Sequence, residues 1–267
     1  MRRQLLLWGA LAGLLVACER WLTTCAGVAP CLAGAGVADW LTMGLDTVAL
    51  MLAPAAVAFS VRVIWLLIAC GWEGRRLTLV ECPPALARLA RELDVRRLHV
   101  LAADVPVAFC AGALRPVVHL SLGAWALLDD DQLRAVLLHE LDHAQRREPL
   151  RRAAMRAASE VGFFLPVVGW LGERRRERSE LRADRRAIER VGARTVAMAL
   201  WALGSEPGPA GLPAFAGAAR LRVAQLLGDP IPRPRPRPSM LAASLVGALL
   251  AAAIVNCAAE IVALWAR

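Results

Sequence analysis

Two histidines four residues apart are the side chains of this chain that most directly suggest chemistry. They are His139 and His143, in the segment His-Glu-Leu-Asp-His. On an α-helix, residues i and i+4 project from one face about a turn apart, which is the spacing that two imidazole ligands of a tetrahedral Zn²⁺ require. Glu140 is offset by one position, so it can act on a water molecule beside the metal without binding the metal itself. The segment therefore predicts one zinc ion per chain, with Glu140 as a catalytic base.

A catalytic zinc ion needs a third protein ligand and an open coordination position. Glu180 and Asp184 place two carboxylates four residues apart on a later predicted helix. We expect Glu180 to complete a His-His-Glu ligand set, and Asp184 to accept the second N–H of a ligating imidazole and so fix its tautomer. The alternative third ligands are Glu177 and Glu173.

The residues around the histidine pair predict the helix that must carry it. Three consecutive Asp residues, 129–131, favour the positive end of a helix and supply a cap. Apolar residues then recur at spacings of three and four, as on the buried face of a helix: they are Leu133, Val136, Leu137, Leu141 and Ala144. Pro149 follows the helix, and a second long helix is predicted from Glu173 to about Val191.

The composition indicates a membrane protein rather than a soluble domain. Hydrophobic residues make up 58% of the 267 residues, and the mean hydropathy is +0.48. A soluble domain has roughly 45–50%, and apolar content this high excludes disorder as the main state. All 32 basic residues are Arg and the formal net charge is +9, whereas seven Cys are too few for a disulfide scaffold.

Three apolar stretches are predicted to form transmembrane helices, at about residues 5–20, 44–70 and 239–267. A spanning helix needs roughly 20 apolar residues, which the second and third stretches provide. The first is shorter, and it also resembles a bacterial lipoprotein signal with Cys18 as the lipidated residue. Because further spans follow it, we expect an uncleaved helix.

Arginine placement predicts the orientation in the membrane. The pairs at 2–3 and 75–76, and the alternating Arg residues at 233–237, flank the three spans on one common side. The segment from about 21 to 40 contains no Lys or Arg. By the positive-inside rule, the N-terminus and the region 73–238 face the cytoplasm. We therefore expect a multi-pass protein of the cell membrane with its site on the cytoplasmic side.

A fourth apolar segment, within residues 155–172, is predicted not to cross the membrane. Its apolar core is only eleven residues long, contains Pro166, and has Arg residues on both sides. Eleven helical residues reach about 16 Å, roughly half of a bilayer core. A single crossing would also separate His143 from Glu180, which could then not share a metal. We expect the segment to dip into the near leaflet or to pack as a helical hairpin beside the site.

The motif set resembles the membrane gluzincin peptidases: HExxH is followed 37 residues later by ExxxD, with membrane spans on both sides. The segments Gly-Ala-Leu-Arg-Pro-Val-Val at 112–118 and Arg-Arg-Glu-Pro-Leu at 146–150 are most similar to the beta-lactam-sensor (BlaR/MecR-like) family. The segment Glu-Leu-Arg-Ala-Asp at 180–184 also resembles the HtpX-like quality-control peptidases, the close alternative. The resemblance covers about residues 100–195.

The resemblance implies a zinc metalloendopeptidase in which His139, His143 and Glu180 bind zinc, Glu140 is the base and Asp184 supports a ligand. It also implies that residues 112–122 form an edge strand that holds the substrate by main-chain pairing. The residues concerned there are Gly112, Pro116 and Val118.

Two departures from these families limit what the resemblance implies. The sensor proteins carry an outer penicillin-binding domain, which this sequence does not contain, so we do not expect drug sensing. Related gluzincins often use a Tyr or His to stabilise the oxyanion, but this chain has no Tyr and offers only His119 as a candidate. The oxyanion partner is therefore not assigned from the sequence.

These inferences predict a mainly α-helical integral membrane protein: transmembrane helices plus a zincin-like helical peptidase domain with a small edge β-sheet. The expected organisation is a membrane region at 1–72, the peptidase domain at 73–205, a Gly/Pro-rich linker at 206–238 and a C-terminal transmembrane helix at 239–267. The alternative is a non-catalytic membrane signalling or scaffold protein that retains the zinc peptidase fold.

The expected partners are the lipid bilayer and a protein substrate, such as a repressor or a membrane protein. Nucleic acid is not an expected partner, because the Arg-rich run at 174–178 is interrupted by Glu and has no interleaved aromatic residues.

Overall fold

The computed structural model describes residues 37–204, 218–232 and 234–265. The chain divides into two compact units, residues 57–245 and residues 1–56 with 246–267. Every predicted site residue lies in the first of these units, residues 57–245. The predicted span at about 5–20 and Cys18 lie outside the described residues.

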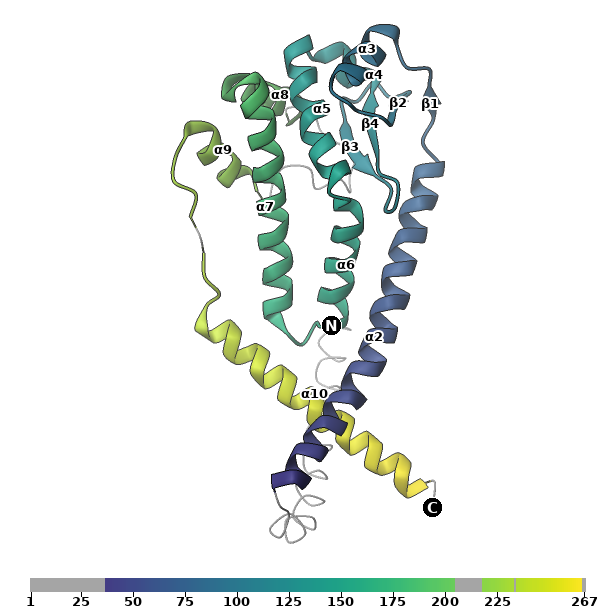
Figure 1. Cartoon of the computed structure of the whole chain (residues 1–267), viewed down its shortest axis with the longest axis vertical. Coiled ribbons are helices and arrows are strands. Elements are labelled where there is room, and N and C mark those ends of the chain that lie inside the picture. Colours follow the sequence, from purple (N-terminus) through teal and green to yellow (C-terminus); the bar gives the residue numbers. More distant parts are fainter. Residues whose placement is uncertain (1–36, 205–217, 233, 266–267) are drawn as a thin grey trace, which may run out of the picture. The chain divides into compact units, whose positions relative to one another are not determined.

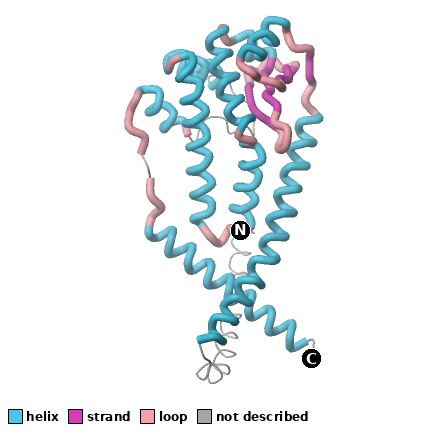
Figure 2. The backbone as a smooth tube through the Cα atoms, in the orientation of Figure 1, coloured by secondary structure: helices cyan, strands magenta, loops and turns pink. Residues whose placement is uncertain are grey.

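The described chain is mostly helical, with one small sheet, as the sequence predicts (Figures 1 and 2). The elements, in chain order, are α2 (Val37–Arg75), β1 (Leu79–Val80), α3 (Pro84–Glu92), β2 (Leu98–Leu101), β3 (Ala108–Ala111), β4 (Val117–Ser121), α4 (Leu122–Leu127), α5 (Asp130–Gln145), α6 (Glu148–Val161), α7 (Pro166–Val191), α8 (Ala193–Gly204), α9 (Ala219–Leu227) and α10 (Pro238–Trp265). Helix α9 lies within the predicted linker 206–238, so that part of the linker prediction is wrong.

The sheet has four strands in the order β1-β2-β4-β3. β4 pairs in parallel with β2 and antiparallel with β3, so Val118 lies opposite Leu98 on one side and Cys110 on the other. The expectation that Val118 lies on an edge strand is therefore wrong, because strand order depends on pairing between distant segments. The two edge strands of this sheet are β1 and β3.

Gly112 and Pro116 lie in the turn between β3 and β4 rather than on a strand. Gly112 has φ 93°, and a Cβ atom there would lie 2.8 Å from the carbonyl oxygen of Arg115. This turn therefore requires glycine, both for its left-handed backbone and for the close approach of the chain.

Helix α5 begins as its sequence predicts. The Asp129 side chain accepts a hydrogen bond from the backbone N–H of Gln132, and the Gln132 side chain accepts one from the backbone N–H of Asp129, which forms a capping box. The apolar face of α5 joins the main hydrophobic core together with α3, α8 and the sheet. This burial holds the helix that carries the histidine pair in one orientation.

Helices α6 and α7 lie side by side and run in opposite directions, joined at residues 162–165 (Figure 1). Pro166 starts α7, at a position where proline removes no helical hydrogen bond. The apolar segment 155–172 thus occupies the ends of two helices and the connection between them. A hairpin of this kind lets α7 return alongside α5, and the two helices pack against each other.

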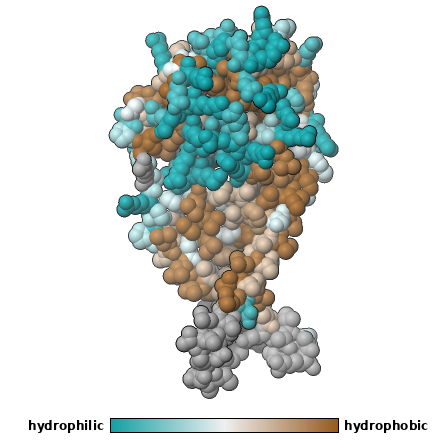
Figure 3. Space-filling view, viewed as in Figure 1, coloured by the Kyte–Doolittle hydropathy of each residue, from teal (hydrophilic) through white to brown (hydrophobic). Residues whose placement is uncertain are grey.

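Two helices are long and apolar enough to cross a membrane among the described residues: Leu45–Arg75 within α2 and Pro238–Ala259 within α10, each with a mean hydropathy of 2.1. Their apolar side chains are exposed, as at Trp65 and Val246. Figure 3 shows hydrophobic side chains gathered over α2 and hydrophilic ones gathered around α5. Length and composition alone identify these two helices as candidates for membrane spans.

Candidate metal centre

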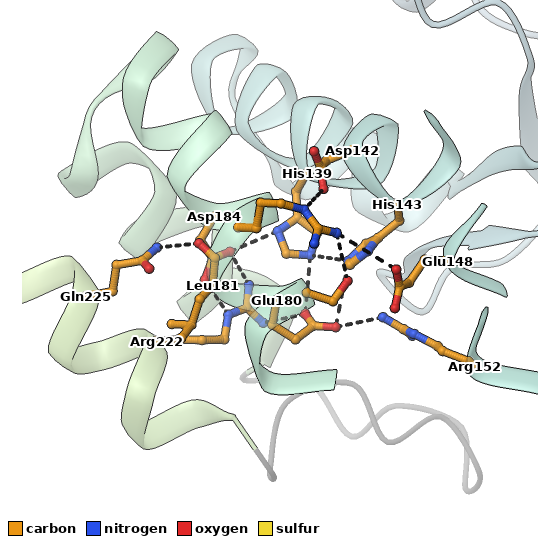
Figure 4. A network of polar contacts seen from close by, with 12 residues as sticks. His139, Asp142, His143, Glu148, Arg152, Glu180, Leu181, Asp184, Arg222 and Gln225 are labelled. Carbon is orange, nitrogen blue, oxygen red and sulfur yellow. Dashed lines mark hydrogen bonds and ion pairs between the residues drawn. The ribbon is translucent and has the colours of Figure 1, made fainter. Parts of the chain in front are cut away.

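Helices α5 and α7 pack against each other and bring the three predicted ligands together (Figure 4). The Nε2 atoms of His139 and His143 are 3.1 Å apart. Oε2 of Glu180 lies 3.4 Å from His139 Nε2, and Oε1 lies 3.7 Å from His143 Nε2. One ligand atom from each residue can be chosen so that all three lie within 4.8 Å of one another.

The donor set fits a zinc ion. A tetrahedral Zn²⁺ with ligands at about 2.0–2.1 Å holds neighbouring donor atoms roughly 3.3 Å apart, close to the separations found here. Two imidazole nitrogens and a carboxylate oxygen also match the ligand types that zinc prefers at catalytic sites. His139, His143 and Glu180 are thus the residues that could hold the metal.

The rival ligands lie elsewhere on α7. Glu177 pairs with Arg174 at 2.5 Å, and Glu173 pairs with Arg176 at 3.5 Å. Neither belongs to the cluster of potential metal ligands found among the described residues. The packing of α7 on α5 therefore favours Glu180, one turn further along the helix than Glu177.

Asp184 holds the far nitrogen of His139. Its Oδ1 lies 2.9 Å from His139 Nδ1, and its side chain is fully buried. With the Nδ1 proton held by Asp184, Nε2 is the nitrogen left to bind a metal. This is the support that the sequence analysis expects of Asp184.

Arg222 completes this arrangement and was not singled out by the sequence analysis. Its Nε and Nη2 each lie 2.6 Å from an oxygen of Asp184, and its Nη1 lies 3.6 Å from Oε2 of Glu180. Arg222 is itself buried, on α9. One arginine among 32 carries no local signal for such a role, because only the packing of α9 on α7 brings it to the site.

The two histidines have opposite protonation tendencies. Burial lowers the pKa of His139, but its hydrogen bonds to Asp184 and Glu180 outweigh burial and raise the pKa to about 9. Burial and the charge of His139 lower the pKa of His143 to about 3. Burial opposes ionisation of Glu180, yet the nearby His139 and His143 hold its pKa well below the usual range.

Glu140 is buried next to the ligands. Burial raises the pKa of its carboxyl group, and the charge of Glu180 adds to this effect, while His139 and the guanidinium groups of Arg152 and Arg222 oppose it. A carboxylate whose pKa lies above the ordinary value is better able to accept a proton and hold it until it is passed on. The environment of Glu140 therefore suits a general base.

β3, one of the two edge strands, borders this site, because both α5 and α6 pack against it. Burial raises the pKa of the Cys110 thiol on β3 to about 12, and the charge of Glu140 contributes to that rise, so β3 lies within the electrostatic reach of the site. His119 faces the other way: its ring stacks on Phe109 with centroids 4.9 Å apart, while its neighbours Val118 and Leu120 join the core that contains α5. Because side chains alternate along a strand, His119 points away from α5 and is not an oxyanion partner.

Fold and site together define a class: a helix carrying a His-Glu-x-x-His pair, with a third carboxylate ligand from a following helix, beside a sheet edge. Residues 84–205 match the model of peptidase family M48. The match extends from α3 to α8, so it includes both ligand-bearing helices. It supports an M48 metallopeptidase, a zinc-dependent class of enzyme, and it does not distinguish the BlaR/MecR-like from the HtpX-like branch.

Proposed function

We propose that this chain is a membrane-bound zinc metalloendopeptidase that hydrolyses peptide bonds of protein substrates at the cytoplasmic face of the cell membrane. The observation that carries the proposal is the convergence of His139, His143 and Glu180, from two helices, beside the buried carboxyl group of Glu140. The family match over residues 84–205 supports the same class of reaction.

The residues of the chain divide the reaction between them. When bound, zinc supplies a Lewis acid that activates water and polarises the scissile carbonyl group. Glu140 accepts a proton from the attacking water and delivers it to the leaving amine. Asp184 keeps His139 in the tautomer that presents Nε2. Since both imidazoles must be unprotonated to bind metal, activity is expected to fall in acid.

The free edge of β3 offers the substrate a place to bind. Unpaired backbone groups on an edge strand can pair with an extended peptide, and the strand then orders the peptide by main-chain hydrogen bonds. β3 occupies the outer position of the sheet, and both α5 and α6 pack against it. A peptide paired with Ala108–Ala111 would thus run past the helix that carries Glu140.

We place the α6–α7 hairpin at the membrane surface. Ala153 and Ala157 on α6 form a small apolar cluster with Leu66 on α2, and Arg62 of α2 pairs with Glu160. The backbone N–H of Val167 donates to the Ser244 hydroxyl of α10 at 3.1 Å. The hairpin therefore packs on segments of both candidate spanning helices, which would keep the metal centre close to the bilayer and suit substrates at or in it.

Single cysteines introduced at the exposed Arg151 and Arg175 test this placement. Both should react with a membrane-impermeant reagent only from the cytoplasmic side of sealed vesicles. Reaction from opposite sides would contradict the hairpin placement, and it would also be incompatible with His143 and Glu180 sharing one metal ion.

A single substitution tests the catalytic proposal. The full chain, purified in detergent with one equivalent of zinc, should cleave an unfolded model protein. Glu140→Gln should still bind one zinc ion but lose about 10²–10⁴-fold in turnover, the range typical of a removed general base. Glu189→Gln, an exposed change of the same kind on α7, should behave like the unmodified chain.

The histidine and carboxylate ligands give the complementary result. His139→Ala, His143→Ala and Glu180→Ala should each lose the zinc ion itself, which is measured as metal content after gel filtration. Full activity in Glu140→Gln would refute the mechanism. A wild-type chain that binds zinc but cleaves no substrate would instead favour a non-catalytic signalling or scaffold protein.

A further inference from the structure

Two guanidinium groups flank the carboxylate of Glu180, and they differ in how fully they are engaged (Figure 4). Arg222 is buried and binds both oxygens of Asp184. Arg152, on α6, reaches Oε1 of Glu180 through Nη2 at 2.7 Å, and about half of its side chain, 47%, is exposed. Arg152 thus places a partly solvent-exposed cation beside the site, whereas the guanidinium group of Arg222 is buried against Asp184.

Peptide hydrolysis generates negative charge on the oxygen of the scissile carbonyl group. Enzymes stabilise that charge with donors held in place before the reaction, and removing one such donor costs about 10²–10³-fold in turnover. The chain contains no Tyr, and two of its four histidines are predicted zinc ligands. The other two, His99 and His119, contact each other at the sheet, where His119 faces away from α5.

Arg152 lies where such a donor is needed. Its Nη2 lies 2.7 Å from Oε1 of Glu180, and that same oxygen lies 3.7 Å from Nε2 of His143. The helix that carries it packs against both β3 and α7. A peptide held along β3 and attacked beside Glu140 would therefore pass within reach of this guanidinium group.

We propose that Arg152 is a catalytic residue, whose guanidinium group stabilises the negative charge on the oxygen of the scissile carbonyl group. This inference rests on the proposed peptidase function. A guanidinium has five N–H donors in a planar fork, so one edge can stay on Glu180 while another meets the substrate. Arg152 donates hydrogen bonds and transfers no proton; the proton moves through Glu140.

Three variants of the zinc-loaded full chain test the role of Arg152. Arg152→Gln removes the charge, and Arg152→Lys keeps a charge but loses the fork. Arg156→Gln is the matched control, because Arg156 lies one turn further along α6 and pairs with Glu160 at 3.0 Å. Zinc stoichiometry reports on the folding of each variant.

We expect Arg152→Gln to lower kcat by about 10²–10³-fold while KM and the zinc Kd change by less than about threefold. Arg152→Lys should fall between Arg152→Gln and wild type, and Arg156→Gln should match wild type. A phosphinic peptide, whose tetrahedral anion imitates the charged oxygen, should lose affinity for Arg152→Gln by a factor similar to the loss in kcat. The corresponding unreactive substrate peptide should not lose affinity.

Two results would overturn the proposal. Arg152→Gln could weaken zinc binding about 10–100-fold and recover full kcat at saturating zinc, which would mean that Arg152 only positions Glu180. Equal affinities of wild type and Arg152→Gln for the phosphinic peptide would also refute it. That second measurement needs no turnover, so it separates failure of this inference from failure of the proposed function, which would show as a zinc-loaded wild type without activity.

Discussion

The metal centre has an interior side, at Asp184 and Arg222, and an open side, at Arg152. Both sides combine arginine, histidine and carboxylate groups, but more of the polar atoms on the interior side have hydrogen-bond partners. On the interior side, Asp184 accepts hydrogen bonds from both His139 and the buried Arg222. On the open side, Arg152 is half-exposed, and Nδ1 of His143 is buried without a hydrogen-bond partner within the described part of the chain. The interior side is thus organised for rigidity, and the open side leaves a cation available for a ligand.

The difference in burial should also make the two sides contribute differently to the free energy of unfolding. A buried ion pair loses several kcal/mol when one partner is removed, since the other charge then stays desolvated. A solvent-exposed pair contributes about 0–1 kcal/mol because water screens it. The interior side should therefore carry stability, and the open side should carry chemistry.

Removal of the interior guanidinium should give the largest effect on stability. Arg222→Met leaves the buried Asp184 with His139 but without its bidentate guanidinium partner, so the free energy of unfolding of the metal-free protein should fall by about 3–5 kcal/mol. Arg152→Met, on the open side, should lower it by less than Arg222→Met does, because Arg152 is half-exposed and Glu180 keeps His139 and Arg222 beside it. Denaturant unfolding in detergent measures both.

The stability contrast has its own control. If Arg222→Met fails to fold, Arg222→Lys retains the charge without the bidentate geometry and should show a smaller loss. Equal losses for Arg222→Met and Arg152→Met would remove the distinction between the two sides.

Asp184→Asn should have an intermediate effect, on metal binding. The amide cannot accept the His139 N–H as strongly as a carboxylate does, so the ligand is less well oriented and less basic. Zinc affinity should fall about 10–100-fold, as is usual when the partner of a ligating histidine is changed. Competition with a chelator of known affinity measures this, and an unchanged zinc Kd would show that Asp184 does not support His139.

The smallest expected effect is a difference in protonation between His139 and His143, which can be observed directly. With a pKa raised to about 9, His139 should be protonated at pH 7 in the metal-free protein, whereas His143, with a pKa lowered to about 3, should be neutral. Nitrogen NMR of histidine-labelled protein distinguishes the two forms. Two neutral rings at pH 7 would contradict the expected strength of the pairing between His139 and its carboxylates.

The sign of the accompanying stability change follows from the raised pKa of His139. An unfolded histidine titrates near about 6.5, so the His139 proton stabilises the metal-free fold fully below that pH. This contribution is lost as the pH rises through about 9. Zinc binding must displace the same proton, so metal and proton compete for this ring.

The sequence by itself determined the parts of the site that depend on one helix. The separation of His139 and His143 by four residues, and the offset of Glu140, follow from the period of the α-helix and need no tertiary information. The capping box at Asp129 and Gln132 is equally local, which is why the start of α5 agrees with the prediction. Length and hydropathy likewise identified the apolar stretches that form α2 and α10.

Only the tertiary structure decided the parts that join distant segments. Spacing along α7 left Glu173, Glu177 and Glu180 as possible ligands, and the packing of α7 on α5 brings only Glu180 of these into the cluster found among the described residues. The sheet order places β1 and β3 at the edges and the strand that contains Val118 inside the sheet, because strand pairing is not encoded in the periodicity of one segment. Arg222 and Arg152 come from helices on either side of Glu180, and an arginine acquires its role from the charges that folding places beside it.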